Sequence, residues 1–209
     1  MSTLSTILSN KIIAIIRGAE PSDVLKIAEA LCEGGVRCIE ITLNSADALK
    51  LIESLAKKMD GMITVGAGTV LNASEVHDAV AAGAKFIISP MLNFDVIHKT
   101  KDLGAVSIPG AYTPTEIFSA FSNGGDLIKV FPSSAGPSFI KEVLAPIPYI
   151  PLMPTGGINL TNIREFKKSG AVAFGIGKSL VDTSQKVTKE HLQQMTINAK
   201  NFIEAITQD

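Results

Sequence analysis

Short apolar runs of strand length alternate along the chain with longer segments in which apolar residues recur at helical spacing. Eight such runs predict strands, at residues 11–16, 36–43, 62–65, 86–89, 105–108, 127–131, 149–153 and 171–176. The helical spacing predicts helices at residues 2–10, 24–32, 45–58, 73–82, 94–103, 114–122, after Pro137, and at 160–169 and 187–206. Apolar strands that alternate with helices are typical of a parallel sheet covered by helices.

Glycine residues end several of the predicted helices at a regular interval. Gly83, Gly104 and Gly125 follow one another at 21-residue steps, which leaves room for one strand, one helix and tight loops. Eight such units predict an α/β fold, a single (β/α)8 TIM barrel over residues 1–209 with a short N-terminal helix. An open doubly wound sheet is the alternative, but the turn after the first strand, residues 17–21, lacks the glycine fingerprint of that fold.

Composition narrows the class of protein. The chain has 209 residues, is 46% hydrophobic and carries a net charge of −1, so charge gives no reason to expect a nucleic-acid or anionic-membrane partner. Cys32 and Cys38 are too few for a disulfide framework, and the three histidines are scattered, so no metal site is expected. There is no run of about 18 apolar residues and no signal-peptide pattern, which predicts a cytoplasmic protein.

Two ionisable residues stand inside predicted strands. Lys129 lies within the apolar run 126–132, and Glu40 lies within the run 38–43. Desolvation lowers the pKa of a lysine, and its neutral amine can attack a carbonyl carbon, with a carboxyl group nearby as general acid and base. Two structural alternatives stay open: Lys129 extends its ammonium group into solvent, or Lys129 and Glu40 form a buried salt bridge.

The ends of the predicted strands carry further polar groups. In a barrel these ends share one face, where active sites lie. Two glycine-rich turns, residues 155–157 and 175–179, follow the last two strands, and backbone N–H groups in such turns can bind phosphate. Arg17 ends the first strand and could hold a carboxylate bidentately. The other strand-end candidates are Thr42, Asn44, Thr69, Ser89, Tyr112 and Thr113.

Six motifs occur in an order that resembles one enzyme family. They are Glu40-Ile-Thr-Leu43, Gly66-Ala-Gly-Thr-Val-Leu71, Ile88-Ser-Pro90, Pro109-Gly110, Lys129-Val-Phe-Pro132 and Pro154-Thr-Gly-Gly-Ile158. Over about residues 11–182 the chain resembles the 2-dehydro-3-deoxy-phosphogluconate (KDPG) and 4-hydroxy-2-oxoglutarate (KHG) aldolases. These are class I aldolases, which form a Schiff base with pyruvate and need no metal or other cofactor.

The resemblance implies a role for each matching residue. Lys129 is implied to form the imine and Glu40 to move protons. The other residues implied to bind substrate are Thr69, Pro90, Phe131 and Thr155 in the pocket, and Gly156, Gly157, Gly177, Lys178 and Ser179 around the phosphate. A serine of the family's phosphate loop falls on Lys178 here, so Lys178 or Ser179 takes its part.

The implied reaction cleaves 2-dehydro-3-deoxy-6-phosphogluconate to pyruvate and glyceraldehyde 3-phosphate, with 4-hydroxy-2-oxoglutarate, which gives pyruvate and glyoxylate, as a further substrate. Asn44, where many gluconate-type relatives have arginine, favours the phosphogalactonate aldolases instead, whereas Pro154-Thr155 is the gluconate-type sequence. The partner is therefore a small phosphorylated keto acid, and the family is typically a homotrimer. Two other functions stay open, a phosphosugar isomerase or epimerase and a non-catalytic effector-binding barrel.

Overall fold

The computed structural model describes residues 2–207. Its helices are α1 (Thr3–Asn10), α2 (Val24–Glu33), α3 (Ala48–Lys58), α4 (Ala73–Ala81), α5 (Phe94–Asp102), α6 (Pro114–Ser122), α7 (Gly136–Leu144), α8 (Ile163–Lys168) and α9 (Lys189–Thr207), with the 3-10 turn η1 (Ser133–Ala135). Its strands are β1 (Ile12–Ile16), β2 (Cys38–Thr42), β3 (Thr64–Gly68), β4 (Phe86–Ile88), β5 (Val106–Ile108), β6 (Gly110–Ala111), β7 (Ile128–Val130), β8 (Leu152–Pro154) and β9 (Phe174–Ile176). Strands and helices thus alternate as the sequence pattern predicts.

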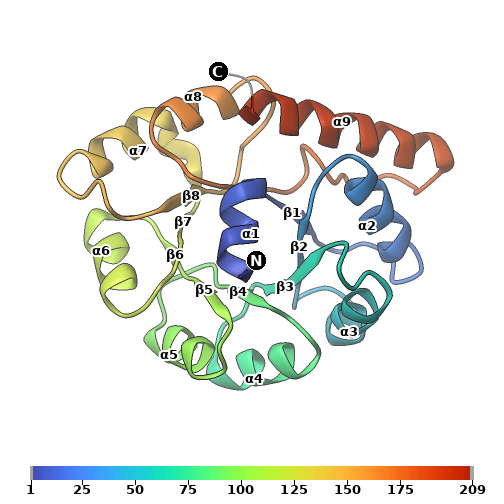
Figure 1. Ribbon diagram of the computed structural model, residues 1–209, viewed down its shortest axis with the longest axis horizontal. Helices are drawn as coiled ribbons and strands as arrows, with labels where there is room; N and C mark the ends of the chain where they lie inside the picture. The colour runs from blue at the N-terminus through green and yellow to red at the C-terminus, as the bar shows by residue number, and fades with distance from the viewer. Residues whose placement is uncertain (1, 208–209) are drawn as a thin grey trace.

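The strands form a curled parallel sheet in the middle of the molecule, and helices surround it (Figure 1). One group of strands runs in the order β5-β4-β3-β2-β1-β9, and a second runs β6-β7-β8. The backbone N–H of Asp126, ahead of β7, donates to the Ser107 carbonyl of β5 at 2.8 Å, and Thr155, after β8, pairs with Gly175 of β9. The predicted α/β fold with parallel strands is confirmed.

Pro109 divides the fifth strand of the series into β5 and β6. Proline has no backbone N–H and interrupts a hydrogen-bonded ladder. The chain then pairs with β7 through Gly110, whose backbone approaches Pro90 so closely that a Cβ would lie 2.4 Å from the Pro90 carbonyl carbon. The Pro109-Gly110 pair, which directly follows the predicted strand 105–108, therefore redirects the strand from one neighbour to the next.

The third strand differs from its prediction. It covers Thr64–Gly68 rather than residues 62–65, so Gly66 and Gly68 lie inside the strand instead of in a turn. A Cβ at Gly66 would lie 2.2 Å from the Phe86 ring, and one at Gly68 would lie 1.6 Å from Oε1 of Glu40. Glycine is needed here because neighbouring side chains occupy the space beside the strand, which a local turn preference does not reveal.

Helix α1 covers one end of the curled sheet and lies across its centre in Figure 1. Ile7 of α1, with Leu4 packed beside it, joins an apolar cluster with side chains of several strands, among them Ile13, Phe86 and Met153. The Asn10 side chain connects the end of α1 to the segment between α2 and β2. It donates to the Gly35 carbonyl at 2.9 Å and accepts from the Arg37 N–H at 3.0 Å. The amino-terminal ends of the strands are therefore covered, and a cavity is left to their carboxyl ends.

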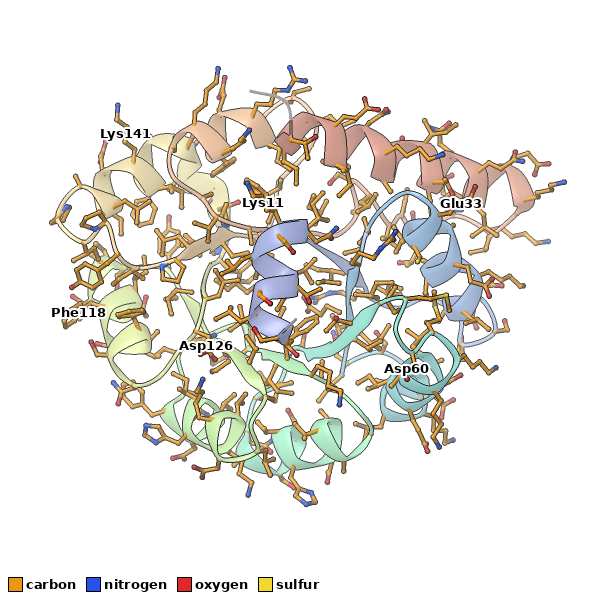
Figure 2. The ribbon with its side chains drawn as sticks, viewed as in Figure 1. Lys11, Glu33, Asp60, Phe118, Asp126 and Lys141 are labelled. Atoms are coloured by element: carbon orange, nitrogen blue, oxygen red, sulfur yellow. The ribbon has the colours of Figure 1, made fainter. Side chains whose placement is uncertain are left out.

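Side chains such as Phe118 and Lys141 project outward from the ring of helices (Figure 2). Within residues 2–207, no helix combines the length and apolar character needed to cross a bilayer. The same residues contain no group of three or more His, Cys, Asp or Glu side chains placed to hold a metal ion.

Candidate active site

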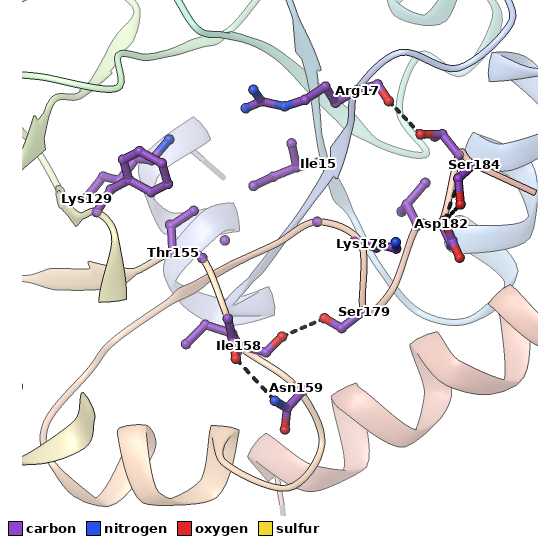
Figure 3. A pocket seen from close by; sticks show the side chains of 17 residues that line it. Ile15, Arg17, Lys129, Thr155, Ile158, Asn159, Lys178, Ser179, Asp182 and Ser184 are labelled. Atoms are coloured by element: carbon purple, nitrogen blue, oxygen red, sulfur yellow. Dashed lines mark hydrogen bonds between the residues drawn. The ribbon is translucent and has the colours of Figure 1, made fainter. Parts of the chain in front are cut away.

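A cavity of about 680 Å³ opens at the carboxyl ends of β1, β7, β8 and β9 (Figure 3). Nine of the residues predicted to form the site line it together: Arg17, Lys129, Phe131, Thr155, Gly156, Gly157, Gly177, Lys178 and Ser179. They come from segments up to 162 residues apart in sequence, from Arg17 to Ser179. The parallel arrangement brings them together because it collects the carboxyl ends of the strands on one face.

Lys129 lies in the middle of β7, and only 3% of its surface is exposed. Burial lowers the pKa of its ammonium group, the nearby Glu40 carboxylate partly opposes this shift, and the Arg17 charge adds to it. The Nζ atom lies 4.9 Å from the centroid of the Phe131 ring. The structure thus excludes the alternative in which Lys129 extends into solvent, and a buried amine of lowered pKa faces the cavity.

Glu40 lies in β2 and is 1% exposed. It does not line the cavity directly, but it is in register with Ile15 of β1, which does. Among the described residues, neither carboxylate oxygen has a hydrogen-bond partner and no cation lies within the 4.0 Å of a salt bridge. Burial raises the pKa of Glu40, while the charges of Lys129 and Arg17 lower it. A static Lys129–Glu40 ion pair is therefore not formed.

The hydroxyl of Thr155 is a third buried oxygen without a partner among the described residues. Gly175 of β9 makes space for this side chain, because a Cβ there would lie 2.3 Å from Thr155 Oγ1. Buried polar atoms in native proteins are nearly always hydrogen-bonded to protein, water or ligand. The Glu40 carboxylate and the Thr155 hydroxyl are thus groups whose hydrogen bonds the fold leaves to water or to a bound molecule.

Side-chain hydrogen bonds hold the carbonyl groups of the glycine-rich loop after β8. The carbonyl groups of residues 156–158 each accept a hydrogen bond from a side chain, in order Ser133, Asn162 at 2.9 Å and Ser179 at 2.5 Å. Carbonyl and N–H groups of a trans peptide point in opposite directions, so the N–H groups of residues 157 and 158 point away from these partners. Neither N–H has an acceptor within residues 2–207. Two donors are therefore available to an anion.

The loop after β9 adds two more donors. The N–H groups of Lys178 and Ser179 have no acceptor within the described part of the chain. The Ser179 hydroxyl donates to the Ile158 carbonyl, so its backbone N–H rather than its side chain is available as a donor. Asp182, also at the cavity, has a pKa lowered to about 2, chiefly by hydrogen bonds from Ser184 and Gln185 and least by the Lys178 charge.

Two residues predicted in the pocket, Thr69 and Pro90, are not among those that line the cavity. Thr69 follows β3 in the left-handed region, with φ of +57°, which is rare for a β-branched residue and typical of functional loops. Pro90 packs against the backbone of Gly110. Their roles in substrate binding stay predictions.

Other strand-end candidates have structural roles. The Ser89 hydroxyl donates to the Met91 carbonyl at 2.8 Å and accepts from the Gly110 N–H. Thr113 caps α6 in a capping box. The hydroxyl groups of Ser89 and Thr113 are thus already engaged in structural hydrogen bonds. A polar residue at a strand end is therefore not by itself evidence of a role in the site.

The sequence analysis missed several residues of the cavity wall, namely Ile15, Ile158, Asn159, Val181, Asp182, Thr183 and Ser184. Ile15 could have been found, since it alternates with Arg17 and therefore lies on the same face of its strand. No local signal identifies residues 181–184, because they reach the site only through the path of the loop after β9.

A family model described as "KDPG and KHG aldolase" matches residues 4–197. A "Probable 2-dehydro-3-deoxy-6-phosphogalactonate aldolase" of Rhizobium meliloti (strain 1021) is 35% identical over 83% of this chain and 82% of its own. A "2-dehydro-3-deoxy-phosphogluconate aldolase" of Haemophilus influenzae is 37% identical over 75% of this chain and 74% of its own. A crystal structure of KDPG aldolase from Legionella pneumophila, with pyruvate captured as a covalent carbinolamine intermediate, has a TM-score of 0.83 at 28% identity and covers 99% of this chain and 98% of that one.

The family match and the carbinolamine structure of a relative, together with a parallel α/β fold that places a buried lysine at its cavity, identify a class I aldolase. The chain belongs to the KDPG and KHG aldolase family. Its activity is that of a carbon–carbon lyase, and the resemblance seen in the six motifs is confirmed.

Proposed function

We propose that this aldolase cleaves a 2-dehydro-3-deoxy-6-phosphohexonate between C3 and C4. The observation that supports this most is that Lys129, buried and without an ion-pair partner among the described residues, lines the cavity, while the unpartnered Glu40 carboxyl group lies near enough for its charge to act on the pKa of Lys129. Burial lowers the pKa of Lys129, which favours the neutral amine, and the neutral amine is the nucleophile toward the C2 ketone. The captured carbinolamine of the Legionella relative supports the same covalent chemistry here.

The reaction proceeds in steps that these residues can carry. Lys129 Nζ adds to C2, and loss of water gives a protonated imine. Glu40, directly or through one water molecule, removes the C4 hydroxyl proton, the C3–C4 electrons move to the iminium nitrogen, and glyceraldehyde 3-phosphate leaves. The enamine is protonated at C3, and hydrolysis of the imine releases pyruvate and restores the amine. The iminium group takes the role of a Lewis acid, so no cofactor enters the scheme.

The two ends of the substrate are bound by different parts of the cavity. Arg17 extends from the end of β1 toward Lys129 and is placed to bind the C1 carboxylate (Figure 3). The unbonded N–H groups of the loops after β8 and β9 bind the phosphate, and Lys178 adds charge. Phe131 and Thr155, with Thr69 and Pro90 nearby, surround the carbons between them.

We propose the gluconate form as substrate, with the galactonate form as the second candidate. The two acids differ at C4, whose hydroxyl proton Glu40 removes, and they yield the same products. Relatives named for each substrate are similarly close, at 37% and 35% identity, and the 35% match covers more of this chain. Rates with both acids, measured side by side with 4-hydroxy-2-oxoglutarate, would assign the preference.

The experiment that tests the proposal is reductive trapping. Pyruvate and borohydride should attach irreversibly to one lysine, and peptide mass mapping should place the adduct on Lys129. Lys129→Arg should keep the fold, as judged by circular dichroism, and lose both the adduct and cleavage. An adduct on Lys178, or turnover by a folded Lys129→Arg variant, would overturn the assignment.

We further propose that the curled sheet closes as a (β/α)8 barrel, a single domain over residues 1–209, and that three chains assemble as a homotrimer. Pairing of β9 with β1 supports closure, together with the Thr155–Gly175 bridge between the ends of β8 and β9. Exposed aromatic side chains such as Phe118 and Tyr149 support assembly. Light scattering should give a mass about three times the 22.0 kDa of one chain.

A further inference from the structure

The peptide group between Arg17 and Gly18 is held at both of its polar atoms by side-chain hydroxyls. The Thr183 hydroxyl donates to the Arg17 carbonyl oxygen at 2.7 Å, and the Gly18 N–H donates to Ser45 Oγ at 2.9 Å. Figure 3 shows the first of these bonds at the edge of the cavity. Because carbonyl and N–H belong to one rigid plane, the two bonds together restrain its rotation.

The two hydroxyls come from distant parts of the chain. Ser45 follows β2, and Thr183 follows β9, 166 residues beyond Arg17. Ser45 Oγ lies 2.9 Å from the hydroxyl of Thr42, which is fully buried at the end of β2. The restraint on this peptide is therefore anchored in the sheet and connects the loops after β1, β2 and β9.

The side chain of Arg17 has no comparable restraint. Among the described residues, its guanidinium group makes no hydrogen bond and no ion pair, and the residue is exposed. Gly18, the next residue, is left-handed with φ of +65°, and a Cβ there would meet nothing within 4 Å. The orientation of the Arg17 side chain at its Cα atom thus depends on the Arg17–Gly18 peptide group, which Thr183 and Ser45 restrain.

We propose that Ser45 and Thr183 are positioning residues that direct Arg17 toward the carboxylate of the keto acid bound at Lys129. This inference rests on the proposed role of Arg17. A bidentate guanidinium–carboxylate contact needs a defined orientation, and a group that is held in place before binding loses less freedom when the ligand arrives. Neither hydroxyl touches substrate in this scheme.

The test measures the pyruvate concentration that gives half-maximal borohydride trapping at Lys129. Thr183→Val and Ser45→Ala should each raise it about 3- to 10-fold, the equilibrium effect of one hydrogen bond. Thr183→Ser retains the hydroxyl and should restore the wild-type value. Inhibition of cleavage by inorganic phosphate should not change, because phosphate binds at the other end of the cavity.

Thr196→Val is a matched control. The Thr196 hydroxyl also donates to a backbone carbonyl of a distant segment, that of Ala30 at 3.0 Å, but between α9 and α2 and away from the cavity. This variant should keep the wild-type pyruvate concentration for half-maximal trapping. An equal rise for Thr196→Val would show that any lost structural hydrogen bond has the effect, and would overturn the inference.

A double-variant cycle separates this inference from the role of Arg17. If Arg17→Met raises the pyruvate concentration and Thr183→Val adds nothing further in that background, Thr183 acts through Arg17. If the two effects multiply, the positioning role is wrong although Arg17 binds the carboxylate. If Arg17→Met itself has no effect, the proposed role of Arg17 fails, and the positioning role fails with it.

Discussion

A Cβ atom on Gly68 would lie 1.6 Å from Oε1 of Glu40, so the carboxylate of Glu40 occupies the space that a side chain on β3 would fill. Gly68 and Glu40 are on neighbouring strands, β3 and β2, and both are buried. A distance this short cannot be relieved by a small adjustment of either side chain. Glu40, the proposed general acid and base, can therefore take this position only because residue 68 is glycine.

Replacing Gly68 with alanine should move Glu40 and impair catalysis. Glu40→Gln should lower turnover about 10²- to 10⁴-fold, the usual range for lost acid–base catalysis, and Gly68→Ala should approach that loss. Imine trapping with pyruvate should persist in both variants, because Lys129 is unchanged. Steady-state cleavage rates and trapping yields provide the measurement. A folded Gly68→Ala variant with wild-type turnover would show that the position of Glu40 is not critical.

The buried carboxyl group of Glu40 should make stability depend on pH. Burial raises its pKa above the usual value of 4.5, so between 4.5 and the raised pKa the folded protein binds more protons than the unfolded chain. Its contribution to the free energy of unfolding is therefore present below pH 4.5 and is lost as pH rises through this interval. Urea unfolding at several pH values should show Glu40→Gln gaining stability relative to wild type as pH rises. A constant difference between the two proteins would contradict this expectation.

The lowered pKa of Lys129 should be visible in the rate of imine formation. Its ammonium group has a usual pKa of 10.5, and burial shifts it downward. The neutral fraction therefore increases with pH through the lowered pKa. The initial rate of pyruvate trapping should rise with pH and reach half of its plateau below pH 10.5. A midpoint at or above pH 10.5 would mean that the reacting lysine is not desolvated.

The phosphate site can be probed at Gly177 with little effect on the fold. A Cβ there would meet nothing within 4 Å, and the residue is not left-handed, so Gly177→Ala should fold normally. The added methyl group should obstruct phosphate at the loop after β9. We expect kcat/KM for the phosphorylated acid to fall about 10-fold or more, and turnover to fall with it, because remote binding energy orients the reacting centre.

The matched substrate for the Gly177→Ala experiment is 4-hydroxy-2-oxoglutarate, which reaches Lys129 and Glu40 but has no phosphate. Its kcat/KM should change little in the variant. Equal losses with both substrates would place the phosphate elsewhere. Gly157 is a poorer probe, because it is left-handed with φ of +79° and any side chain there strains the loop.

Much of this molecule could be predicted from local pattern. The alternation of apolar strands and helices depends on period and burial, which short segments encode, and the parallel α/β fold followed from it. Lys129 and Glu40 could be singled out as candidates because an ionisable residue inside an apolar strand is costly without a function or a partner. The family motifs added the class of reaction, and the family model confirms it.

Long-range packing decided the rest. Gly66 and Gly68 fall outside the predicted strand 62–65, but they lie in β3, where Phe86 and Glu40 from neighbouring strands fill the space beside them. The cavity wall at residues 181–184 and the hydroxyls on the Arg17–Gly18 peptide likewise depend on loops that meet only in the folded chain. A local pattern records what a segment prefers, whereas these features depend on which side chains another strand brings to the same point.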